Sequence, residues 1–528
     1  MSNRYVALDQ LDLKNKIGQL FMCGFGGHEP TEGIGRLIEE YGLGGIIYFR
    51  RNLRDAAQVA RMTEALQARA AAPLLVSIDQ EGGMVVRLEE GVTVMPGAMA
   101  IGAADDAQLA CDAARWSGAE LRAIGVNMNF APCLDVNNNP RNPVIGVRAY
   151  GENPYKVAEL GTAAIRGYQE GGIAAVAKHF PGHGDTGSDS HYELPVVPHG
   201  RDRLDAVELV PFRAAISAGV DAIMTAHVVF PAYEPDNVPA TLSKRILTGL
   251  LREQLGYDGV VVTDCLEMNA ISETIGVARG AVEAIKGGAD LILVSHRLDR
   301  QIAALEAVYE AALAGEIPLS RIDEAVRRVW ALKEKRGLFA DALPLQPVAS
   351  KAEAVARQLS ERAVTVVKGG ELLPIPKGNR TLVVWAEPRE NTEVVEAIEQ
   401  SWTLGAALRA EGLDVTELAV GLKPTEEEQG RVLSAASSAE TIVFASYDAG
   451  FSDSQTALIR TLCSLEGKAF VLAALRAPYD LLGAPAVPVY VCTYENKPTM
   501  MTALAGVLTG RLPAQGRQPI TIGEYARV

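Results

Sequence analysis

The stretch GGIAAVAKHFPGHGDTGSDSH (171–191) contains the pattern that decides the fold. A glycine turn leads into an apolar run typical of a buried β-strand, and the run ends at Lys178, where a polar loop begins. The loop holds three of the chain's seven histidines, and it has no helical or strand period. Long glycine-rich loops with titratable side chains are usually functional. The stretch therefore predicts a parallel strand whose carboxyl end opens into a functional site.

The first part of the chain repeats this unit. Most of the apolar runs follow a glycine-containing turn, and helical stretches separate them; the expected strands are 19–24, 45–49, 74–78, 127–132, 174–178, 222–225, 260–263 and 291–295. Eight β units over this length predict a (β/α)8 TIM barrel. An open doubly wound sheet is the alternative, but no GxGxxG motif opens a helix after the first strand.

A helix over 321–336 is expected to close the barrel, with Ser320 as its N-cap and Gly337 as its stop. The segment FADALPLQPVAS follows, and its two prolines and lack of period predict a linker.

We therefore expect a TIM-barrel catalytic domain over 1–340, a linker over 341–352 and a smaller C-terminal α/β sandwich over 353–528. The second domain is expected to follow a helix at 351–363 and to contain strands over 381–386, 415–418, 441–445, 470–473 and 487–492. Because the candidate catalytic groups precede Gly337, we expect this domain to be structural or modulatory.

Composition excludes several classes of protein. A net charge of −15 opposes binding to nucleic acid, which requires a basic face. The N-terminus has no signal-peptide pattern, and no segment approaches the ~20 apolar residues that span a bilayer. The six cysteines lack CxxC spacing, which favours buried reduced thiols. We expect a cytoplasmic protein with no nucleic-acid or membrane partner, and the sequence does not indicate its oligomeric state.

Ionisable side chains recur where the expected strands end. In barrel enzymes the reacting groups lie at the carboxyl ends of the strands, and these positions hold Asp79, Lys178, His179, His227, Asp264 and His296. In the loop, Asp189 precedes His191 by two residues, and a carboxylate so close can orient an imidazole and raise its basicity. The pair is a candidate general acid/base.

The motif KHFPGHGDTGSDSH (178–191) resembles the signature of the NagZ-type β-N-acetylglucosaminidases of glycoside hydrolase family 3. Two further segments resemble that family in order and spacing: IDQEGGMVVRL (78–88) and VVTDCLEMNAI (261–271). The resemblance covers the barrel and extends more weakly to the second domain. It implies a retaining exo-enzyme that releases terminal GlcNAc from β-linked glycosides, such as cell-wall (muropeptide) or chitin fragments. A role in peptidoglycan recycling would follow, with a small carbohydrate substrate.

The resemblance also assigns roles. Asp264 falls on the catalytic nucleophile, His191 on a histidine acid/base and Asp189 on its partner. Sugar contacts fall on Asp79, Arg87, Arg148, Lys178 and His179. Independently of the resemblance, Met268 is a candidate to line the sugar site or to fill the core.

The chemistry needs no metal or cofactor. His179 and His183 are four residues apart, but Pro181 and the nearby glycines oppose the helix that a zinc site of that spacing uses.

Four alternatives remain at this point. A histidine repels an incoming phosphate less than a carboxylate would, so phosphorolysis by a β-N-acetylglucosaminide phosphorylase is possible. A family 3 β-glucosidase would generally have an SDW-type nucleophile segment and take its acid from the second domain. A Schiff-base aldolase would use Lys178 as its nucleophile. A non-catalytic sugar-binding protein would lack Asp264, His191 or Asp189, and all three are present. If His191 is not the proton donor, the nearest candidates are Asp185, Glu193 and His227.

Overall fold

The computed structural model describes residues 5–192, 194–340, 349–389, 400 and 402–525. The first domain is a barrel of eight parallel strands in the order β7-β6-β5-β4-β3-β2-β1-β8. A parallel bridge between Val262 and Leu291 joins the two ends of that order and closes the barrel. The strands are β1 Phe21–Cys23, β2 Gly45–Tyr48, β3 Leu75–Ile78, β4 Met128–Asn129, β5 Ala174–Phe180, β6 Ala222–Thr225, β7 Val260–Val262 and β8 Ile292–Val294. The predicted TIM barrel is confirmed.

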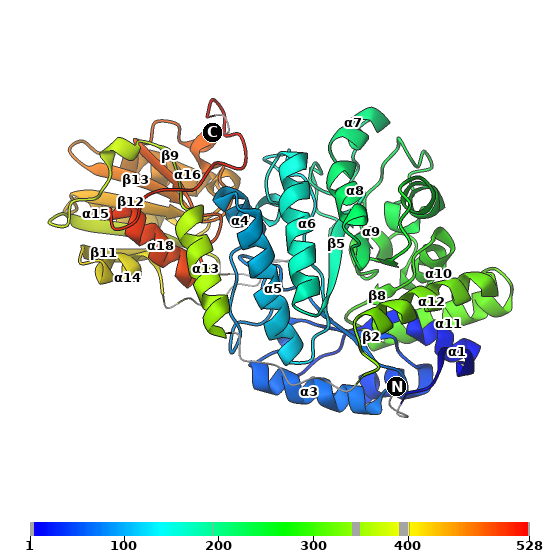
Figure 1. The fold of residues 1–528 in the computed structure, drawn as a ribbon. Helices are drawn as coiled ribbons and strands as arrows, with labels where there is room; N and C mark the ends of the chain where they lie inside the picture. The colour runs from blue at the N-terminus through cyan, green and yellow to red at the C-terminus, as the bar shows by residue number, and fades with distance from the viewer. Residues whose placement is uncertain (1–4, 193, 341–348, 390–399, 401, 526–528) are drawn as a thin grey trace.

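Helices cover the outside of the barrel (Figure 1). Every strand residue is buried, as expected of parallel strands that are covered on one face and filled with side chains on the other. The α-helices are α1 Leu13–Gln19, α2 Glu32–Tyr41, α3 Ala56–Arg69, α4 Ala98–Ala104, α5 Ala107–Ala123, α6 Pro154–Glu170, α7 Arg201–Ala206, α8 Leu209–Ser217, α9 Asn269–Ser272, α10 Val277–Gly287, α11 Leu298–Leu313 and α12 Leu319–Lys335. A π-helix, η5, spans Arg245–Gln254, and a short 3-10 helix, η3, spans Gly146–Arg148.

Two local predictions differ from the structure. The fourth strand pairs regularly over only two residues, because the chain then reaches Pro132, which has no N–H to donate to a ladder. The N-cap of α12 is Pro318 rather than Ser320, which lies inside the first turn. The stop is as predicted, since Gly337 adopts a φ of +69° just beyond the helix.

The second domain contains a six-stranded sheet in the order β11-β10-β12-β13-β14-β9. Its strands are β9 Thr365–Lys368, β10 Arg380–Glu387, β11 Asp414–Gly421, β12 Thr441–Ser446, β13 Ala469–Ala474 and β14 Val489–Cys492. All pairs are parallel except that of β9 with β14. The sequence analysis missed β9, a four-residue edge strand that directly follows a helix.

The helices of this domain are α13 Ala349–Ala363, α14 Leu404–Ala410, α15 Glu426–Ala436, α16 Asp453–Cys463, α17 Asp480–Gly483 and α18 Pro498–Leu508. Helices α13, α14 and α18 pack together, as do α15 and α16, so helices flank the sheet as in an α/β sandwich (Figure 1).

Helix α13 connects the two domains. It packs against α4 and α5 of the barrel and against α18 of the second domain. Ala352, Ala356 and Leu359 belong to the barrel core, whereas Ala363, at the end of the helix, belongs to the core of the second domain. Most of the predicted linker, residues 341–348, lies outside the described residues, and the described chain resumes directly in α13.

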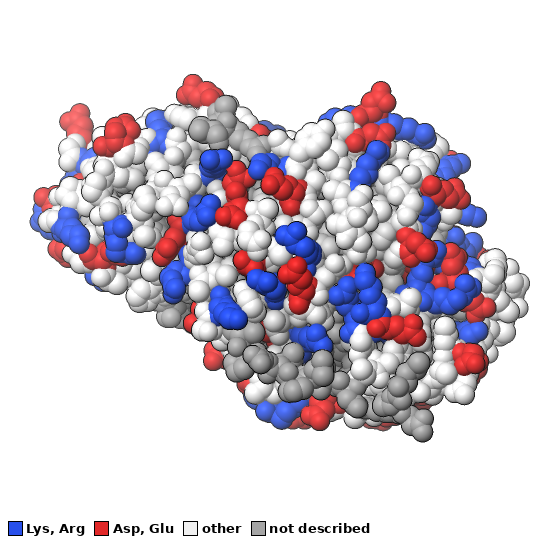
Figure 2. All heavy atoms as spheres, viewed as in Figure 1, with Lys and Arg blue, Asp and Glu red and all other residues white. Residues whose placement is uncertain are grey.

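No helix in the described part of the chain is both long and apolar enough to cross a membrane. Figure 2 shows basic and acidic side chains interspersed over the face in view, without a continuous basic patch. Five of the six cysteines are buried and all six are free thiols, as the sequence predicts.

The buried Lys333 on α12 gives a prediction about stability. Its Nζ donates to Gln19 Oε1 at 2.6 Å, and burial lowers its pKa to about 7. An unfolded lysine has a pKa of ~10.4. Between these values the unfolded chain binds a proton that the folded chain does not, so this group makes the free energy of unfolding rise with pH by up to about 1.4 kcal/mol per unit.

We expect Lys333→Met to flatten the rise in unfolding free energy between pH 7 and about pH 9.5, measured by urea unfolding. Lys377→Met, at an exposed lysine, should leave the slope of the parent protein unchanged. Equal slopes in all three proteins would contradict the assignment.

Candidate active site

A cavity of about 400 Å³ opens at the carboxyl ends of the barrel strands. All of the site residues predicted from the sequence line this cavity except Asp189, namely Asp264, His191, Asp79, Arg87, Arg148, Lys178, His179 and Met268. Its floor is apolar and includes Ile47, Met224 and Leu293. The volume lies in the range of pockets that enclose a small ligand. Segments nearly 190 residues apart in sequence thus meet in one site.

Asp264 follows β7 on a rigid part of the backbone. Thr263 N donates to Leu291 O at 2.9 Å and Leu266 N to Leu293 O at 3.0 Å, so β8 fixes the chain on both sides of the aspartate. The Cys265 amide donates to Asp264 Oδ1 at 2.7 Å. Burial opposes ionisation, but the surrounding imidazoles and this amide outweigh it and hold the pKa of Asp264 below its ordinary value. The carboxylate is therefore ionised and precisely placed at neutral pH.

His191 and Asp189 form the predicted pair. His191 Nδ1 lies 2.6 Å from Asp189 Oδ1, and the same oxygen accepts the His191 amide at 2.9 Å. Because the carboxylate can only accept, Nδ1 carries the proton and Nε2 is the nitrogen left to act on a ligand. Burial lowers the pKa of His191, but the hydrogen bond and charge of Asp189 outweigh it and raise the pKa overall. Asp189 thus stabilises the protonated imidazole relative to that of a free histidine.

The loop that carries this pair is held by a second histidine. The Thr186 hydroxyl donates to His183 O at 3.1 Å, so towards His183 Nδ1, 2.8 Å away, it can only accept. His183 Nε2 is then an acceptor for the Ser190 hydroxyl at 3.2 Å. Burial lowers the pKa of His183 to about 4, which keeps the ring neutral and suits this arrangement. Ser190, between Asp189 and His191, is thereby tied to the base of the loop.

A partly buried ionic cluster lies beside the two catalytic candidates. It consists of Asp79, Glu81, Arg148 and Lys178. The Lys178 ammonium donates to Asp79 Oδ1 at 2.8 Å and lies 2.7 Å from Glu81 Oε1. Arg148 donates two hydrogen bonds to the same Glu81 carboxylate, from Nε at 3.0 Å and from Nη2 at 2.8 Å. Burial favours the neutral amine of Lys178, but the two carboxylates outweigh it and raise its pKa.

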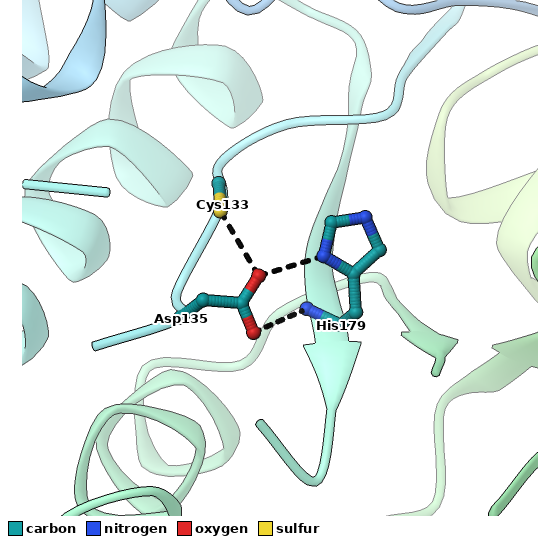
Figure 3. A group of neighbouring side chains, drawn as sticks. All are labelled: Cys133, Asp135 and His179. Carbon is teal, nitrogen blue, oxygen red and sulfur yellow. Dashed lines mark hydrogen bonds and ion pairs between the residues drawn. The ribbon is translucent and has the colours of Figure 1, made fainter. Parts of the chain in front are cut away.

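A fully buried carboxylate, Asp135, orients His179 (Figure 3). Its Oδ2 accepts from His179 Nδ1 at 2.7 Å and from Cys133 Sγ at 3.1 Å. Its Oδ1 accepts the amides of His183 at 2.6 Å and His179 at 3.3 Å. With the proton on Nδ1, His179 Nε2 can accept from Arg148 Nη2 at 3.4 Å. Asp135 thus connects His179 to the loop that carries the acid/base candidate.

Asp135, Cys133 and His179 lie close enough together to be considered as metal ligands, as do Cys265, Glu267 and His296. In the first group each donor atom is already hydrogen-bonded to another member, and burial raises the pKa of the Cys133 thiol well above its ordinary range. Burial likewise raises the pKa of Cys265 to about 12. Protonated thiols are poor ligands, so neither group has the chemistry of a zinc site.

The remaining candidates are Met268 and the three alternative proton donors, His227, Asp185 and Glu193. Met268 lines the cavity and also packs in the apolar cluster inside the barrel, so it has both of the roles expected for it, lining the site and filling the core. Both ring nitrogens of His227 are engaged, Nδ1 with Thr241 Oγ1 at 2.7 Å and Nε2 with Cys265 O at 2.9 Å. Asp185 pairs with His199. Glu193 lies outside the described residues.

The sequence analysis missed Glu81 and Asp135. Glu81 lies in the quoted segment IDQEGG, two residues beyond Asp79, and the period-2 alternation of a strand end would have placed both on one side. Asp135 follows the fourth strand closely, where a barrel places its functional groups. The cavity also includes Phe49, which no sequence pattern marks, Arg51, which follows the second strand and is interpreted from the sequence as a solvated residue, and His296, which lies at a strand end.

Comparison with known proteins now bears on this geometry. The model of the glycosyl hydrolase family 3 N terminal domain matches residues 12–332, which contain all eight barrel strands. The chain belongs to glycoside hydrolase family 3.

Relatives of this family 3 enzyme agree with the assignment. Beta-hexosaminidase A of Pseudoalteromonas piscicida is 32% identical and aligns over 93% of this chain and 91% of its own. The beta-hexosaminidase of Thiobacillus denitrificans is 36% identical over 61% of this chain and 95% of its own. A solved family 3 beta-N-acetylglucosaminidase from Paenibacillus sp. str. FPU-7 is 52% identical, with a TM-score of 0.95 over 97% of this chain and 99% of that one. The family resemblance and the prediction of a glycoside hydrolase are confirmed.

Asp135→Asn should test the role of the buried carboxylate in this family 3 enzyme. Replacing one oxygen by an NH₂ group leaves the Nδ1 proton of His179 or the His183 amide without its acceptor, so we expect turnover of an aryl β-glycoside to fall roughly 10- to 100-fold, as when a group that orients an active-site histidine is lost.

Asp221→Asn is a matched control, because Asp221 is also buried but lies at the amino end of β6, where barrel residues serve stability. It should lower the unfolding midpoint and spare the turnover of the folded enzyme. Equal kinetic losses in the two variants would contradict a specific role for Asp135.

Proposed function

We propose that this protein is a retaining exo-β-N-acetylglucosaminidase that works through a covalent glycosyl-aspartate intermediate. The observation that carries the proposal is one cavity containing an ionised aspartate fixed to the barrel, Asp264, and a histidine oriented by a carboxylate that raises its pKa, His191. Retaining hydrolysis requires a nucleophilic carboxylate and a proton donor for the leaving oxygen.

In the first step, Asp264 attacks the anomeric carbon and the bond from that carbon to the glycosidic oxygen breaks. His191 Nε2 gives its proton to the departing oxygen, which leaves as an alcohol. The raised pKa of His191 favours the protonated form that this step consumes. The ring ends the step neutral, with Asp189 still accepting from Nδ1.

In the second step, neutral His191 takes a proton from water and the resulting oxygen attacks the anomeric carbon. The bond to Asp264 breaks, the sugar is released with its original anomeric configuration, and both side chains return to their starting states. A single imidazole can serve as acid and then as base because the ordinary pKa of a histidine, ~6.5, lies near neutrality.

The ionic cluster supports recognition of a terminal sugar. Buried Arg87 and Lys178 and half-buried Asp79 line the cavity with charged groups that can bind ring hydroxyls in a water-poor site. The apolar barrel core closes the cavity below, which favours an enzyme that takes one sugar from the end of a chain.

The substrate assignment rests on the names of the relatives, which are hexosaminidases and a β-N-acetylglucosaminidase. We propose a GlcNAc-terminated cell-wall or chitin fragment as the substrate and the cytoplasm as the place of action, consistent with a role in recycling peptidoglycan.

The aldolase alternative has little support. Schiff-base formation requires a neutral amine, whereas Lys178 is held as an ammonium between Asp79 and Glu81. Phosphorolysis is a matter for experiment: the products formed with and without phosphate should be compared, and we expect free GlcNAc rather than the sugar 1-phosphate in both.

Asp264→Ala should lower kcat for 4-nitrophenyl β-GlcNAc by several orders of magnitude while leaving the unfolding midpoint close to that of the parent enzyme. A 2-fluoro or 5-fluoro glycosyl donor should become covalently attached to Asp264, as measured by mass spectrometry of peptides. Labelling of any other residue would refute the nucleophile.

His191→Ala should reduce turnover most for glycosides with poor leaving groups, because these depend on protonation of the departing oxygen. For an activated 4-nitrophenyl glycoside, loss of the base should slow the second step, so KM should fall with kcat and azide should restore turnover.

Asp189→Asn keeps the imidazole but removes the charge that raises its pKa. Since the first step needs protonated His191, we expect the alkaline limb of kcat/KM to move to lower pH. If both variants slow good and poor leaving groups equally and azide has no effect, another proton donor must be sought.

A further inference from the structure

Residues 79–88 form a folded-back hairpin that carries part of the proposed sugar site. Asp79 and Glu81 stand at its start and Arg87 at its end. Gly82 and Val85 pair at the tip. Within the hairpin, Gln80 Oε1 accepts the Arg87 amide at 2.9 Å and Gln80 Nε2 donates to Leu88 O at 2.7 Å. A shift of the tip would therefore be transmitted to the ionic cluster.

The tip of this hairpin touches the second domain rather than the barrel alone. Met84 packs against the core of the second domain, whereas its neighbour Val85 lines the cavity. A further contact follows the hairpin, where Lys497 Nζ lies 3.0 Å from Glu89 Oε1. In the described part of the chain, no side chain of the second domain lines the cavity itself. Any effect of the second domain on the site must therefore pass through contacts between the domains, of which those at the hairpin adjoin the proposed sugar-binding residues.

The centre of the contact is Glu495, which lies three residues beyond the end of β14 at Cys492 and follows Tyr494. Tyr494 has a φ of +66°, an uncommon conformation for a tyrosine, and its hydroxyl donates to Thr365 Oγ1 at 2.9 Å. The turn directs Glu495 towards the barrel domain. There its side chain is 1% exposed, and its Oε2 accepts the Gly97 amide at 2.7 Å. Burial raises the pKa of Glu495 to about 7, although this amide and Lys497 oppose the shift.

A glycine at the tip makes room for that carboxylate. A Cβ atom on Gly83 would lie 2.6 Å from Glu495 Oε2 and 2.7 Å from Gly97 Cα, and Gly83 has a φ of +56°. Gly83 N also donates to Met95 O at 2.8 Å, which fixes the tip beside Gly97. The tip and the carboxylate thus lie too close together for a side chain between them, although more than 400 residues separate them in sequence.

We infer that Glu495 is a positioning residue through which the second domain holds the 79–88 hairpin, and with it Asp79, Glu81 and Arg87, in the geometry that binds the terminal sugar. The inference rests on the proposed function for the identity of that sugar. It gives the second domain a defined part in the site without placing any of its atoms on the substrate.

The test compares four full-length proteins: the parent enzyme, Glu495→Ala, Glu495→Gln and Glu417→Ala. Glu417 is the matched control, because its Oε1 also accepts a glycine amide, that of Gly405 at 2.9 Å, but inside the second domain. Three quantities are measured: hydrogen exchange of peptides covering 79–97, inhibition by GlcNAc, and kcat and KM with 4-nitrophenyl β-GlcNAc.

For Glu495→Ala we expect faster exchange in the hairpin, and inhibition by GlcNAc and kcat/KM weaker by about tenfold or more, since misplacement of positioning groups by 1 Å can cost ~100-fold. Glu495→Gln should restore most of the parent values, because its amide oxygen can still accept from Gly97. Glu417→Ala should lower the unfolding midpoint without changing any of the three quantities.

Unchanged hairpin exchange and GlcNAc inhibition in Glu495→Ala would overturn the inference, as would equal changes in Glu417→Ala. If Glu495→Ala does not fold, Glu495→Asp replaces it; this variant keeps the charge but is one methylene too short to reach Gly97, and the same outcomes decide. A parent enzyme that neither binds GlcNAc nor hydrolyses its glycosides would instead refute the proposed function, and the exchange experiment would still decide the role of Glu495.

Discussion

The site depends on the burial of one ammonium group. Taking a lysine out of water costs several kcal/mol unless its charge is paired, and Lys178 is 2% exposed. Its charge is balanced by Asp79 and Glu81, which come from the end of β3, while Glu81 in turn requires Arg148 from η3. Lys178 and Glu81 each have two partners, so displacing Lys178 would take the ammonium from Asp79, and displacing Glu81 would take the carboxylate from Arg148. The ends of β3 and β5 and the η3 helix are therefore locked to one another, and the cavity is shaped before any ligand enters.

The loop after β5 shows how neighbours give one residue type three different states. His179 carries its proton on the nitrogen that faces Asp135, and it presents an acceptor to Arg148. His183 is neutral because it is buried among hydroxyl groups, and it serves as a structural pin. Only His191 has a carboxylate partner that raises its pKa while its other nitrogen faces the cavity. The loop thus combines a binding group, an anchor and a proton donor within thirteen residues.

The barrel could be predicted because buried parallel strands are continuous apolar runs, and because their carboxyl ends share one face regardless of the exact strand limits. For this reason Asp79, Lys178 and Asp264 could be placed together from the sequence. The contacts between side chains could not. Asp135 and His179 are 44 residues apart and Gly97 and Glu495 are 398 apart, and no local pattern records such pairs. Short edge strands such as β9 are missed for a related reason, because β9 pairs with β14, which lies more than 100 residues further along the chain.

Helix α13 has a consequence for how the protein unfolds. Ala352, Ala356 and Leu359 complete the barrel core, while its last residue, Ala363, belongs to the core of the second domain. Unfolding of either domain would expose apolar surface of this shared helix to water and so lower the stability of the other domain. The stabilities of the two domains are therefore coupled. Calorimetry of such a molecule would give one merged endotherm rather than two independent ones. The unit of cooperativity is then the whole chain, even though its two sheets are separate.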